Sequence, residues 1–451
     1  MTKRPLINYD HSLMFAGRPS GSVPLEDEMH ELIRRLETVK TEVLRQKRAK
    51  LIGFFHSPDA LSDIRATEKL AAELRRQYKT LVVIGIGGSD LGARAILHAL
   101  GPVSGGLAVE FIGANTDPEE IAALLRRLDL KTTVLNIVSK SGDTIEPMSV
   151  FFLLRDRLIK AVGLKRHAAQ VVATTDRKQG TLRRICELEG YRTLPIPADV
   201  GGRFSALTPV GLFPAACAGI DIRKILTGAR QVRDSFIAAP AAKNGPLLFA
   251  GLHWEAYLRR SQHITVLMPY AEALRDFGFW FRQLWAESLG KKHDRVGRTM
   301  FHGFTPVAAL GATDQHSQIQ LYNEGPLDKT VTFIEVARFR EDLDTVAPYP
   351  EIEGAAYIGG HTFSEIIHAE RLATAIALAK NNRPSGTLTI PGISPQAIGG
   401  LMFFFEIAVA AMGELLDINV YDQPGVEAGK RAMCALLGRA GYELDQPKIK
   451  H

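Results

Sequence analysis

Short apolar runs alternate with longer amphipathic stretches along most of the chain. The runs of the first half end at glycine or small polar residues, and the stretches between them carry apolar residues at helical spacing. This alternation is typical of parallel strands connected by crossover helices. The expected strands lie at residues 81–86, 109–112, 132–138 and 170–174, and expected helices between them include 118–128 and 144–159. Together they predict one doubly wound parallel sheet.

A second set of strand-like runs follows a connecting segment at residues 238–246, whose alanines, prolines and glycine are typical of a connection between lobes. The new strands are expected at residues 264–268, 307–310, 331–336 and 387–390. We divide the chain into an N-terminal helical arm with a first lobe (1–238), a second lobe (239–395) and a C-terminal helical segment (396–451). A length of 451 residues supports two lobes, because single cores rarely grow so large.

Residues 397–416 are apolar enough to be considered as a membrane span. Glu406 and Glu414 interrupt this stretch, and several glycines lie within it. Charged side chains are costly inside a bilayer, so a buried core helix is the better interpretation. We therefore expect no association with a membrane.

Composition narrows the class of protein. Hydrophobic residues at 46% and charged residues at 23% are typical of a soluble globular chain. The net charge of +6 comes from scattered basic residues, which suits a small acidic substrate better than a nucleic acid. The three cysteines are far apart, without zinc-binding spacing, and the polar start lacks the apolar segment of a signal peptide. The cytoplasm is the expected location.

Ligands of open parallel sheets bind beyond the carboxyl ends of the strands, so the residues after each expected strand are candidates for chemistry. The first such segment, residues 85–92, contains a glycine-rich turn around Gly88 and Ser89. It is not a dinucleotide fingerprint, because Asp90 occupies the position of the third glycine. This disfavours a nicotinamide dehydrogenase. The free amides and Ser89 can approach an anion or a hydroxyl, although a tight turn from strand to helix explains the glycines equally well.

The second segment follows the expected strand at 132–138 and opens a helix. It contains three hydroxyls, a lysine and an aspartate, in the order Ser139, Lys140, Ser141, Gly142, Asp143 and Thr144. Hydroxyls, a lysine and the free amides of a helix start can together hold a phosphate, whereas a helix cap alone requires only one of these side chains. The segment lacks the Gly-Lys-Ser/Thr ending of a nucleotide-binding loop, which favours a phosphate monoester.

Three further segments are ambiguous when each is considered alone. Gly201 and Gly202 can place Arg203 in a confined site, where an arginine stabilises an oxyanion, but a surface arginine fits as well. Gln283 and Glu287 share one helix face, although an isolated glutamate near a helix end is usually solvated.

His316 lies just past the expected strand at 307–310 and could simply cap a turn. Lys430 closes the segment 421–430 and could simply be solvated.

Taken together and in this order, the five segments resemble those of the glucose-6-phosphate isomerase family. Residues 200–205 resemble one of its two signature patterns, and residues 421–430, ending Gly-Val-Glu-x-Gly-Lys, resemble the other. The similarity extends from the strand at 81–86 to Lys430. It implies an α/β fold of two sugar-isomerase-type sandwich lobes, with parallel sheets flanked by helices and with C-terminal helices. It also implies a reaction that needs neither a metal nor an organic cofactor.

The resemblance also implies roles for single residues. Glu287 would carry a proton between C2 and C1 of a hexose 6-phosphate through a cis-enediol, and Arg203 would face the enediolate charge. His316 and Lys430 would open the sugar ring. The implied phosphate loop is Ser139, Lys140, Ser141 and Thr144, and the implied sugar contacts are Gly88, Ser89, Gln283 and Gln423. The reaction would be the interconversion of glucose 6-phosphate and fructose 6-phosphate in glycolysis and gluconeogenesis.

The family further implies a homodimer in which His316 of one chain completes the site of the other. Asp143 departs from the family pattern, since many members have threonine there, and a carboxylate beside a phosphate repels it unless it turns away as a helix cap. Two alternatives remain open at this point. One is a sugar-phosphate-sensing protein without catalysis, and the other is an isomerase that also acts on mannose 6-phosphate.

Overall fold

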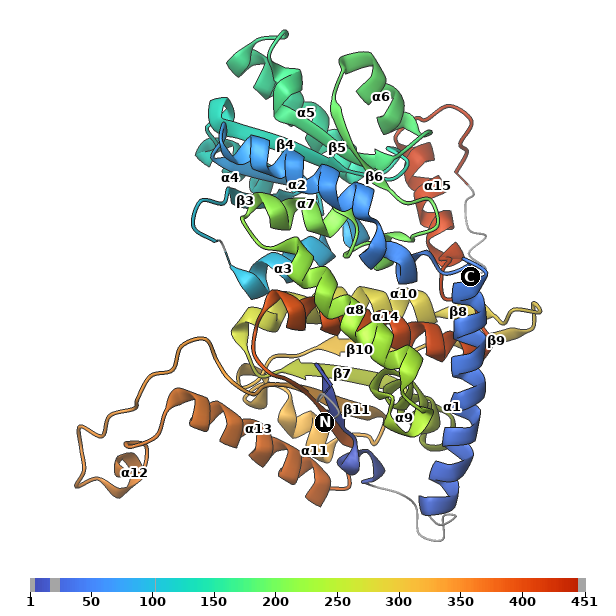
Figure 1. Ribbon diagram of the computed structural model, residues 1–451, viewed down its shortest axis with the longest axis vertical. Helices are drawn as coiled ribbons and strands as arrows, with labels where there is room; N and C mark the ends of the chain where they lie inside the picture. Colours follow the sequence, from blue (N-terminus) through green and yellow to red (C-terminus); the bar gives the residue numbers. More distant parts are fainter. Residues whose placement is uncertain (1–4, 17–24, 102, 445–451) are drawn as a thin grey trace, which may run out of the picture.

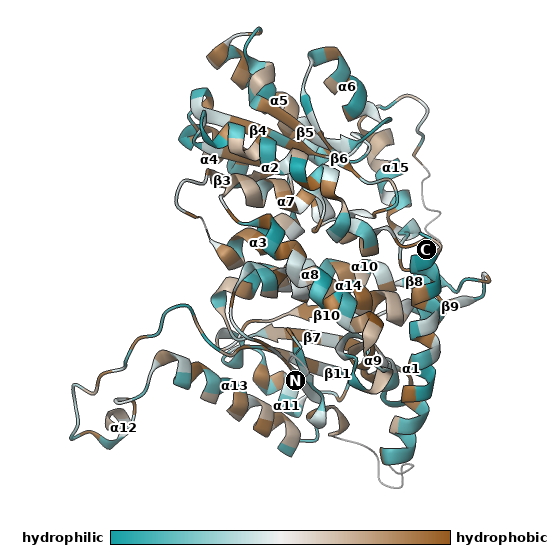
Figure 2. Ribbon diagram, viewed as in Figure 1, coloured by the Kyte–Doolittle hydropathy of each residue, from teal (hydrophilic) through white to brown (hydrophobic). Residues whose placement is uncertain are grey.

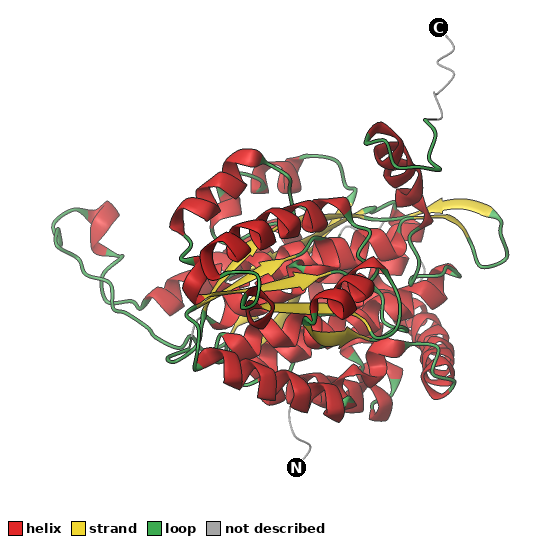
Figure 3. Cartoon of the chain, turned by 90° about the horizontal axis from the view of Figure 1, so that it is seen from above, coloured by secondary structure: helices red, strands yellow, loops and turns green. Residues whose placement is uncertain are grey.

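The computed structural model describes residues 5–16, 25–101 and 103–444. In this part of the chain, two sheets of mainly parallel strands lie one above the other, with helices between and around them (Figure 1). Seen from above, helices cover the strands on both sides (Figure 3). This arrangement agrees with the predicted α/β class.

The first sheet has the order β3-β2-β4-β5-β6, and all of its strands are parallel. Its strands are β2 (Thr80–Ile84), β3 (Ala108–Ile112), β4 (Thr133–Val138), β5 (Val171–Asp176) and β6 (Arg192–Ile196). The four predicted strands are confirmed within a few residues. The pattern of apolar runs did not predict β6, because its arginine, threonine and proline break that pattern, as an edge strand permits.

Side chains of β2 alternate between two cores on the two faces of this sheet. Leu81 and Val83 belong to the large central core, whereas Val82 and Ile84 pack with Phe151 in a separate outer core. The helices around this sheet are α2 (Leu61–Arg75), α3 (Leu91–Leu100), α4 (Pro118–Arg127), α5 (Ile145–Val162), α6 (Thr181–Glu189) and α7 (Pro209–Cys217). Both faces of β2 are therefore buried, which explains its continuous apolar run.

The second sheet has the order β1-β12-β11-β7-β10. Its parallel strands are β7 (Ile264–Pro269), β10 (Thr305–Ala308), β11 (Lys329–Val336) and β12 (Ser385–Ile390), which confirms the four predicted strands. The strand β1 (Asn8–Asp10) pairs with β12 in the antiparallel direction. A separate hairpin joins β8 (Lys291–His293) to β9 (Thr299–His302). The beginning of the chain thus contributes an edge strand to the sheet of the second half.

The remaining helices are α1 (Leu25–Arg48), α8 (Ile222–Ala238), α9 (Gly245–Arg260), α10 (Arg275–Leu289), α11 (Ile319–Glu324), α12 (Glu353–Ala356), α13 (Phe363–Lys380), α14 (Pro395–Leu416) and α15 (Glu427–Leu436). Most of them surround this sheet or fill the space between the two sheets, whereas α12 lies on a projecting arm and α15 lies beside the first sheet (Figure 1).

The helix α14 is long and apolar enough to cross a membrane, yet 94% of its most apolar window is buried inside the molecule. It lies between the two sheets, where Figure 2 shows apolar residues concentrated. A Cβ added to Gly399 would lie 1.9 Å from the carbonyl oxygen of Ile225 in α8, so the two helices contact each other backbone to backbone. The prediction of a buried core helix is confirmed.

A long arm around α12 projects away from the body of the molecule (Figure 1). It connects β11 to α13 and carries large apolar side chains that are mostly exposed, among them Leu343 at 68%, Val346 at 77% and Tyr357 at 72%.

Candidate active site

Two glycine turns from the first lobe meet directly beside α10. One turn, Gly87–Ser89, follows β2, and the other, Gly202–Phe204, follows β6. A Cβ added to Gly88 would lie 2.2 Å from the carbonyl carbon of Gly202, so only glycine allows this approach. Ser205 Oγ also donates a hydrogen bond to the Gly88 carbonyl at 3.3 Å. The close approach fixes the position of Arg203 relative to the end of β2.

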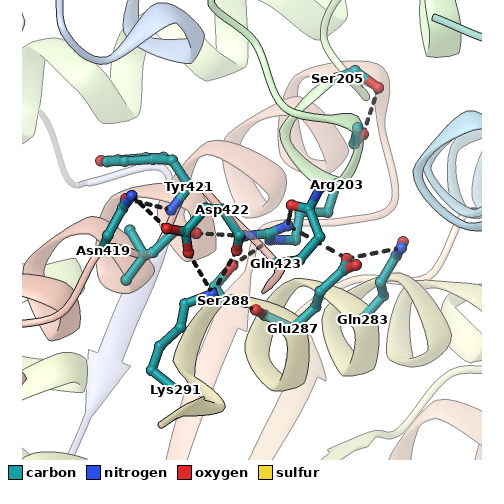
Figure 4. A network of polar contacts seen from close by, with 12 residues as sticks. Arg203, Ser205, Gln283, Glu287, Ser288, Lys291, Asn419, Tyr421, Asp422 and Gln423 are labelled. Carbon is teal, nitrogen blue, oxygen red and sulfur yellow. Dashed lines mark hydrogen bonds and ion pairs between the residues drawn. The ribbon is translucent and has the colours of Figure 1, made fainter. Parts of the chain in front are cut away.

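Arg203 is buried, with 3% of its surface exposed, and is held through all three of its guanidinium nitrogens (Figure 4). Its Nε donates to Ser288 Oγ at 2.6 Å, and one terminal nitrogen donates to Gln423 Oε1 at 2.9 Å. The other terminal nitrogen donates to the carbonyl oxygens of Val420 and Asp422, at 2.5 and 3.0 Å. The pKa of Arg203 lies below its usual value because of burial, and the neighbouring carboxylates of Glu287 and Asp422 offset only part of this lowering. An arginine in this position is a rigid, partly desolvated positive charge.

Glu287 lies next to this charge, near the end of α10. Its Oε2 atom is 3.5 Å from a terminal nitrogen of Arg203 and accepts a hydrogen bond from Gln283 Nε2 at 3.2 Å. The side chain of Glu287 remains 26% exposed, and it faces a cavity. The spacing of four residues places Gln283 and Glu287 on one face, as the sequence predicts. The result is an accessible carboxylate whose orientation is fixed by two neighbours.

Lys291 and Ser288, which have no predicted role, support this arrangement. Lys291 Nζ donates to the carbonyl oxygens of Glu287, at 3.1 Å, and of Asp422, and lies 3.2 Å from a carboxylate oxygen of Asp422. Burial is the main cause that lowers the pKa of Lys291, and the nearby positive charge of Arg203 lowers it further. Lys291 therefore connects the end of α10 to the loop at 420–423. The one available signal was its place four residues after Glu287, next to Gly290.

The cavity at this site has a volume of about 540 Å³, within the usual range for a small-molecule site. Many residues named from the sequence lie on its wall: Gly88, Ser141, Thr144, Gln283, Glu287, Gln423 and Lys430. They come from both lobes and from α15. Tertiary folding thus brings together residues from four separate segments.

One end of the cavity is suited to an anion. The start of α5 faces it, since Thr144, Ile145 and Glu146 all lie on the wall. Thr144 occupies the N-cap position of α5 but makes no capping hydrogen bond with its side chain. Ser141 Oγ accepts from the backbone amide of Asp143 at 3.1 Å, which leaves its own hydrogen for an acceptor outside the turn. Hydroxyls and free helix-start amides are the donors that a phosphate requires.

Other residues of the predicted phosphate loop lie off the wall. Lys140 Nζ donates to the carbonyl oxygens of Ala198, at 2.8 Å, and Val200, at 3.2 Å, in the segment that leads to Arg203. Ser139 is buried, and its Oγ accepts from the Gly142 amide at 3.0 Å. In this conformation both side chains stabilise neighbouring loops.

Four further predicted residues differ in their positions relative to the cavity. Ser89 is half-buried in its turn and is not on the wall, whereas Arg203 approaches the cavity through its contact with Glu287. His316 is exposed just after the turn Thr313–Gln315, also off the wall. Lys430, on the wall, forms an exposed ion pair with Glu427 at 2.8 Å.

The geometry defines a class of protein. Two α/β lobes with parallel strands enclose a cavity that has one end suited to an anion and, on its wall, an oriented carboxylate beside a buried arginine. Such a site can hold a phosphorylated small molecule and move a proton where negative charge develops.

Comparison with known proteins identifies the family within that class. The family model described as "Phosphoglucose isomerase" matches residues 61–440, and the chain belongs to this family. It is 44% identical over 416 residues to "Glucose-6-phosphate isomerase" of Carboxydothermus hydrogenoformans, covering 90% of this chain and 89% of that protein. It is 36% identical over 455 residues to "Glucose-6-phosphate isomerase" of Symbiobacterium thermophilum, covering 97% and 99%.

Two solved structures have the same fold. A protein of Thermus thermophilus, described as hypothetical, superposes with a TM-score of 0.85 at 36% identity, covering 96% of this chain and all of that one. A glucose-6-phosphate isomerase from Chlamydia trachomatis superposes with a TM-score of 0.83 at 24% identity, covering 96% of this chain and 88% of that one. The predicted resemblance to this family is confirmed.

Proposed function

We propose that this protein interconverts glucose 6-phosphate and fructose 6-phosphate by ring opening and proton transfer through a cis-enediol, as a step of glycolysis and gluconeogenesis. The observation that carries the proposal is the Glu287 carboxylate, which is exposed to the cavity and lies 3.5 Å from the buried Arg203. Relatives with the name glucose-6-phosphate isomerase along nearly the whole chain support the same substrate pair.

Glu287 is the base that removes the proton from the sugar carbon next to the carbonyl. Gln283 and Arg203 both contact its Oε2 atom, so Oε1 can take up the proton. Proton transfer by a positioned carboxylate contributes about a hundred- to ten-thousand-fold to the rate. Arg203 stabilises the negative charge that develops on the sugar oxygens, and its four hydrogen bonds keep it in place without reorganisation during the reaction.

Ring opening is assigned to Lys430 and His316. Lys430 lies on the cavity wall, and its ion pair with Glu427 is exposed on both sides, so breaking that pair costs little. Ser141, Thr144 and the start of α5 hold the phosphate group, and Gly88, Gln283 and Gln423 contact the sugar.

We assign His316 to the site of a second copy of this chain. Its exposure and its position away from its own cavity support this assignment. The arm around α12 also supports a dimer, because exposed apolar side chains such as Val346 and Tyr357 are better accommodated against another protein surface. We place the protein in the cytoplasm, and its three unpaired cysteines support a reducing compartment.

The dimer assignment is tested by mixing two inactive variants, Glu287→Gln and His316→Ala. A mixed dimer regains one site with both residues intact, so activity should return to a measurable fraction of the wild-type level. Mixed dimers verified by two affinity tags, yet inactive, would contradict a shared site.

The catalytic assignment is tested by Glu287→Gln, with formation of fructose 6-phosphate from glucose 6-phosphate measured in a coupled assay. The amide keeps the volume of the side chain but cannot accept the proton, so kcat should fall at least about a hundredfold while KM changes little.

Glu110→Gln is the matched control for this experiment, because Glu110 also pairs with an arginine, Arg127, but lies off the cavity wall. This control should keep kcat within about threefold. Near-normal turnover by Glu287→Gln would exclude Glu287 as the base. Turnover of mannose 6-phosphate, measured in parallel, tests the specificity.

A further inference from the structure

The phosphate end of the cavity carries a negative charge from its own loop. Asp143 lies on the wall between Ser141 and Thr144, and its Oδ1 accepts a hydrogen bond from Thr181 Oγ1 at 2.9 Å. It does not cap α5, since the N-cap residue is Thr144. A phosphate monoester carries between about one and a half and two negative charges at neutral pH, so this carboxylate opposes its binding.

The lysine of the same loop does not compensate for this charge. Lys140 donates to two backbone carbonyls on the far side of the loop and is not on the wall. A phosphate at this position therefore needs a positive charge from another segment of the chain.

Arg439 supplies a positive charge at this position. It follows α15, where Gly438, with a φ of 74°, reverses the chain direction. The amides of Gly438 and Arg439 donate to the carbonyl oxygens of Ala435, at 3.0 Å, and Cys434, at 2.9 Å, as in a Schellman motif. This tight ending turns Arg439 back toward the cavity, and its side chain lies on the wall.

The guanidinium of Arg439 is oriented by its neighbours. One terminal nitrogen is 3.8 Å from Asp143 Oδ1, and the group lies 5.1 Å from the ring centre of Tyr442, which is also on the wall. Arg431 lies 5.8 Å from the centre of the same ring and lines the same cavity. A planar guanidinium beside one carboxylate keeps further N–H donors for a second anion.

We infer that Arg439 is a phosphate-binding residue of this enzyme: it neutralises Asp143 and donates hydrogen bonds to the phosphate of the bound hexose. The inference rests on the proposed function, since it requires a phosphorylated substrate in this cavity. It also assigns a role to the C-terminal turn, which lies beyond both signature segments. The isomerised carbons lie at the other end of such a substrate, so Arg439 contributes equally to ground state and transition state.

The test compares Arg439→Met with the wild type, because methionine keeps much of the length and packing against Tyr442. Arg439→Met should raise KM for glucose 6-phosphate about tenfold, the effect of one charge-assisted hydrogen bond, with kcat within about threefold. The dissociation constant of sorbitol 6-phosphate, measured by calorimetry, and the inhibition constant of inorganic phosphate should rise in parallel. Arg127→Met is the matched control, because Arg127 is similarly exposed, at 53% against 47%, and pairs with Glu110. It should leave all three constants unchanged.

A second background separates direct phosphate binding from simple neutralisation of Asp143. In Asp143→Asn, the additional change Arg439→Met should still raise KM several-fold. If Arg439→Met has no effect in that background, or leaves all three constants unchanged in the wild type, the inference is wrong. Failure of the wild-type protein to convert glucose 6-phosphate would instead refute the proposed function.

Discussion

Replacing Arg203 by lysine keeps the charge but removes the geometry that holds the site together. The guanidinium donates to four acceptors, namely Ser288 Oγ, Gln423 Oε1 and the carbonyls of Val420 and Asp422. A lysine amine is one point with three donors and cannot reach acceptors spread around a planar fork. We expect at least two acceptors to lose their partner, and each loss of a hydrogen bond to a charged donor costs about 1.5–3 kcal/mol. Relaxation toward the cavity offsets part of this cost, which leaves about 3 kcal/mol.

Urea unfolding followed by tryptophan fluorescence measures this loss, because Trp280 and Trp285 are buried in α10, the helix that carries Ser288. The variant should still fold, since native proteins are typically stable by about 5–15 kcal/mol. Its kcat should fall at least about a hundredfold, because a displaced cation no longer faces the developing charge.

Arg127→Lys is the control for an exposed arginine in a single ion pair, and it should change stability by less than about 0.5 kcal/mol. If Arg203→Lys changes stability no more than this control and retains normal turnover, the hydrogen-bond network does not position the arginine, and the reasoning is refuted.

Three further predictions follow from other contacts. Gly88→Ala should reduce activity more than tenfold and lower the free energy of unfolding by about 1–3 kcal/mol, because its Cβ would meet the Gly202 backbone at 2.2 Å. Gly201→Ala is the control and should be tolerated, because its Cβ would meet nothing closer than 3.8 Å. Equal effects of the two changes on turnover and thermal unfolding would contradict the backbone contact. Burial raises the pKa of Asp90 to about 6, so its stabilising contribution is complete below the unfolded pKa of about 3.9 and is lost as the pH rises through 6. The unfolding free energy of the wild type should therefore fall by up to about 3 kcal/mol relative to Asp90→Asn between pH 4 and 7, and a constant difference in urea unfolding would exclude this titration. Lys430→Ala should slow turnover of the cyclic sugar more than turnover of an open-chain analogue, and equal losses on both would remove its proposed role in ring opening.

Most of the framework could be predicted from the sequence because it depends on local patterns. Apolar runs at the eight predicted strands reflect burial on both faces of parallel sheets, and the resulting residue pattern is visible within a few positions. The apolar pattern did not predict the strands β1 and β6, because edge strands tolerate polar residues and proline. Their sequences therefore resemble those of loops. The chain reversal at Gly438 is also local, but nothing in the sequence shows that it turns Arg439 toward a cavity.

The residue types of the candidate site and their order along the chain could be predicted from the sequence, but most of the contacts between them could not. The helical spacing of four residues placed Gln283 and Glu287 together, and their contact at 3.2 Å follows from that spacing. Lys140 was assigned to phosphate as part of a loop rich in hydroxyls at a helix start and by resemblance to the family, yet its amine in this structure donates to carbonyls 58 and 60 residues away. Ser288 has no distinguishing sequence signal, and Lys291 has only its spacing of four residues from Glu287, because the burial of both depends on how α10 meets the loop at 420–423.

The sequence by itself determined the two α/β lobes with parallel strands, the core position of α14 and the family. All three follow from the spacing of apolar residues or from short motifs of adjacent residues. Only the tertiary structure decided which charges face one another. Arg203 reaches the Asp422 carbonyl across 219 residues of chain, and Arg439 reaches Asp143 from a segment after the last helix. Such pairs depend on the packing of segments that are distant in sequence, and an electrostatic interaction acts over a few ångströms of space regardless of the chain length between its partners.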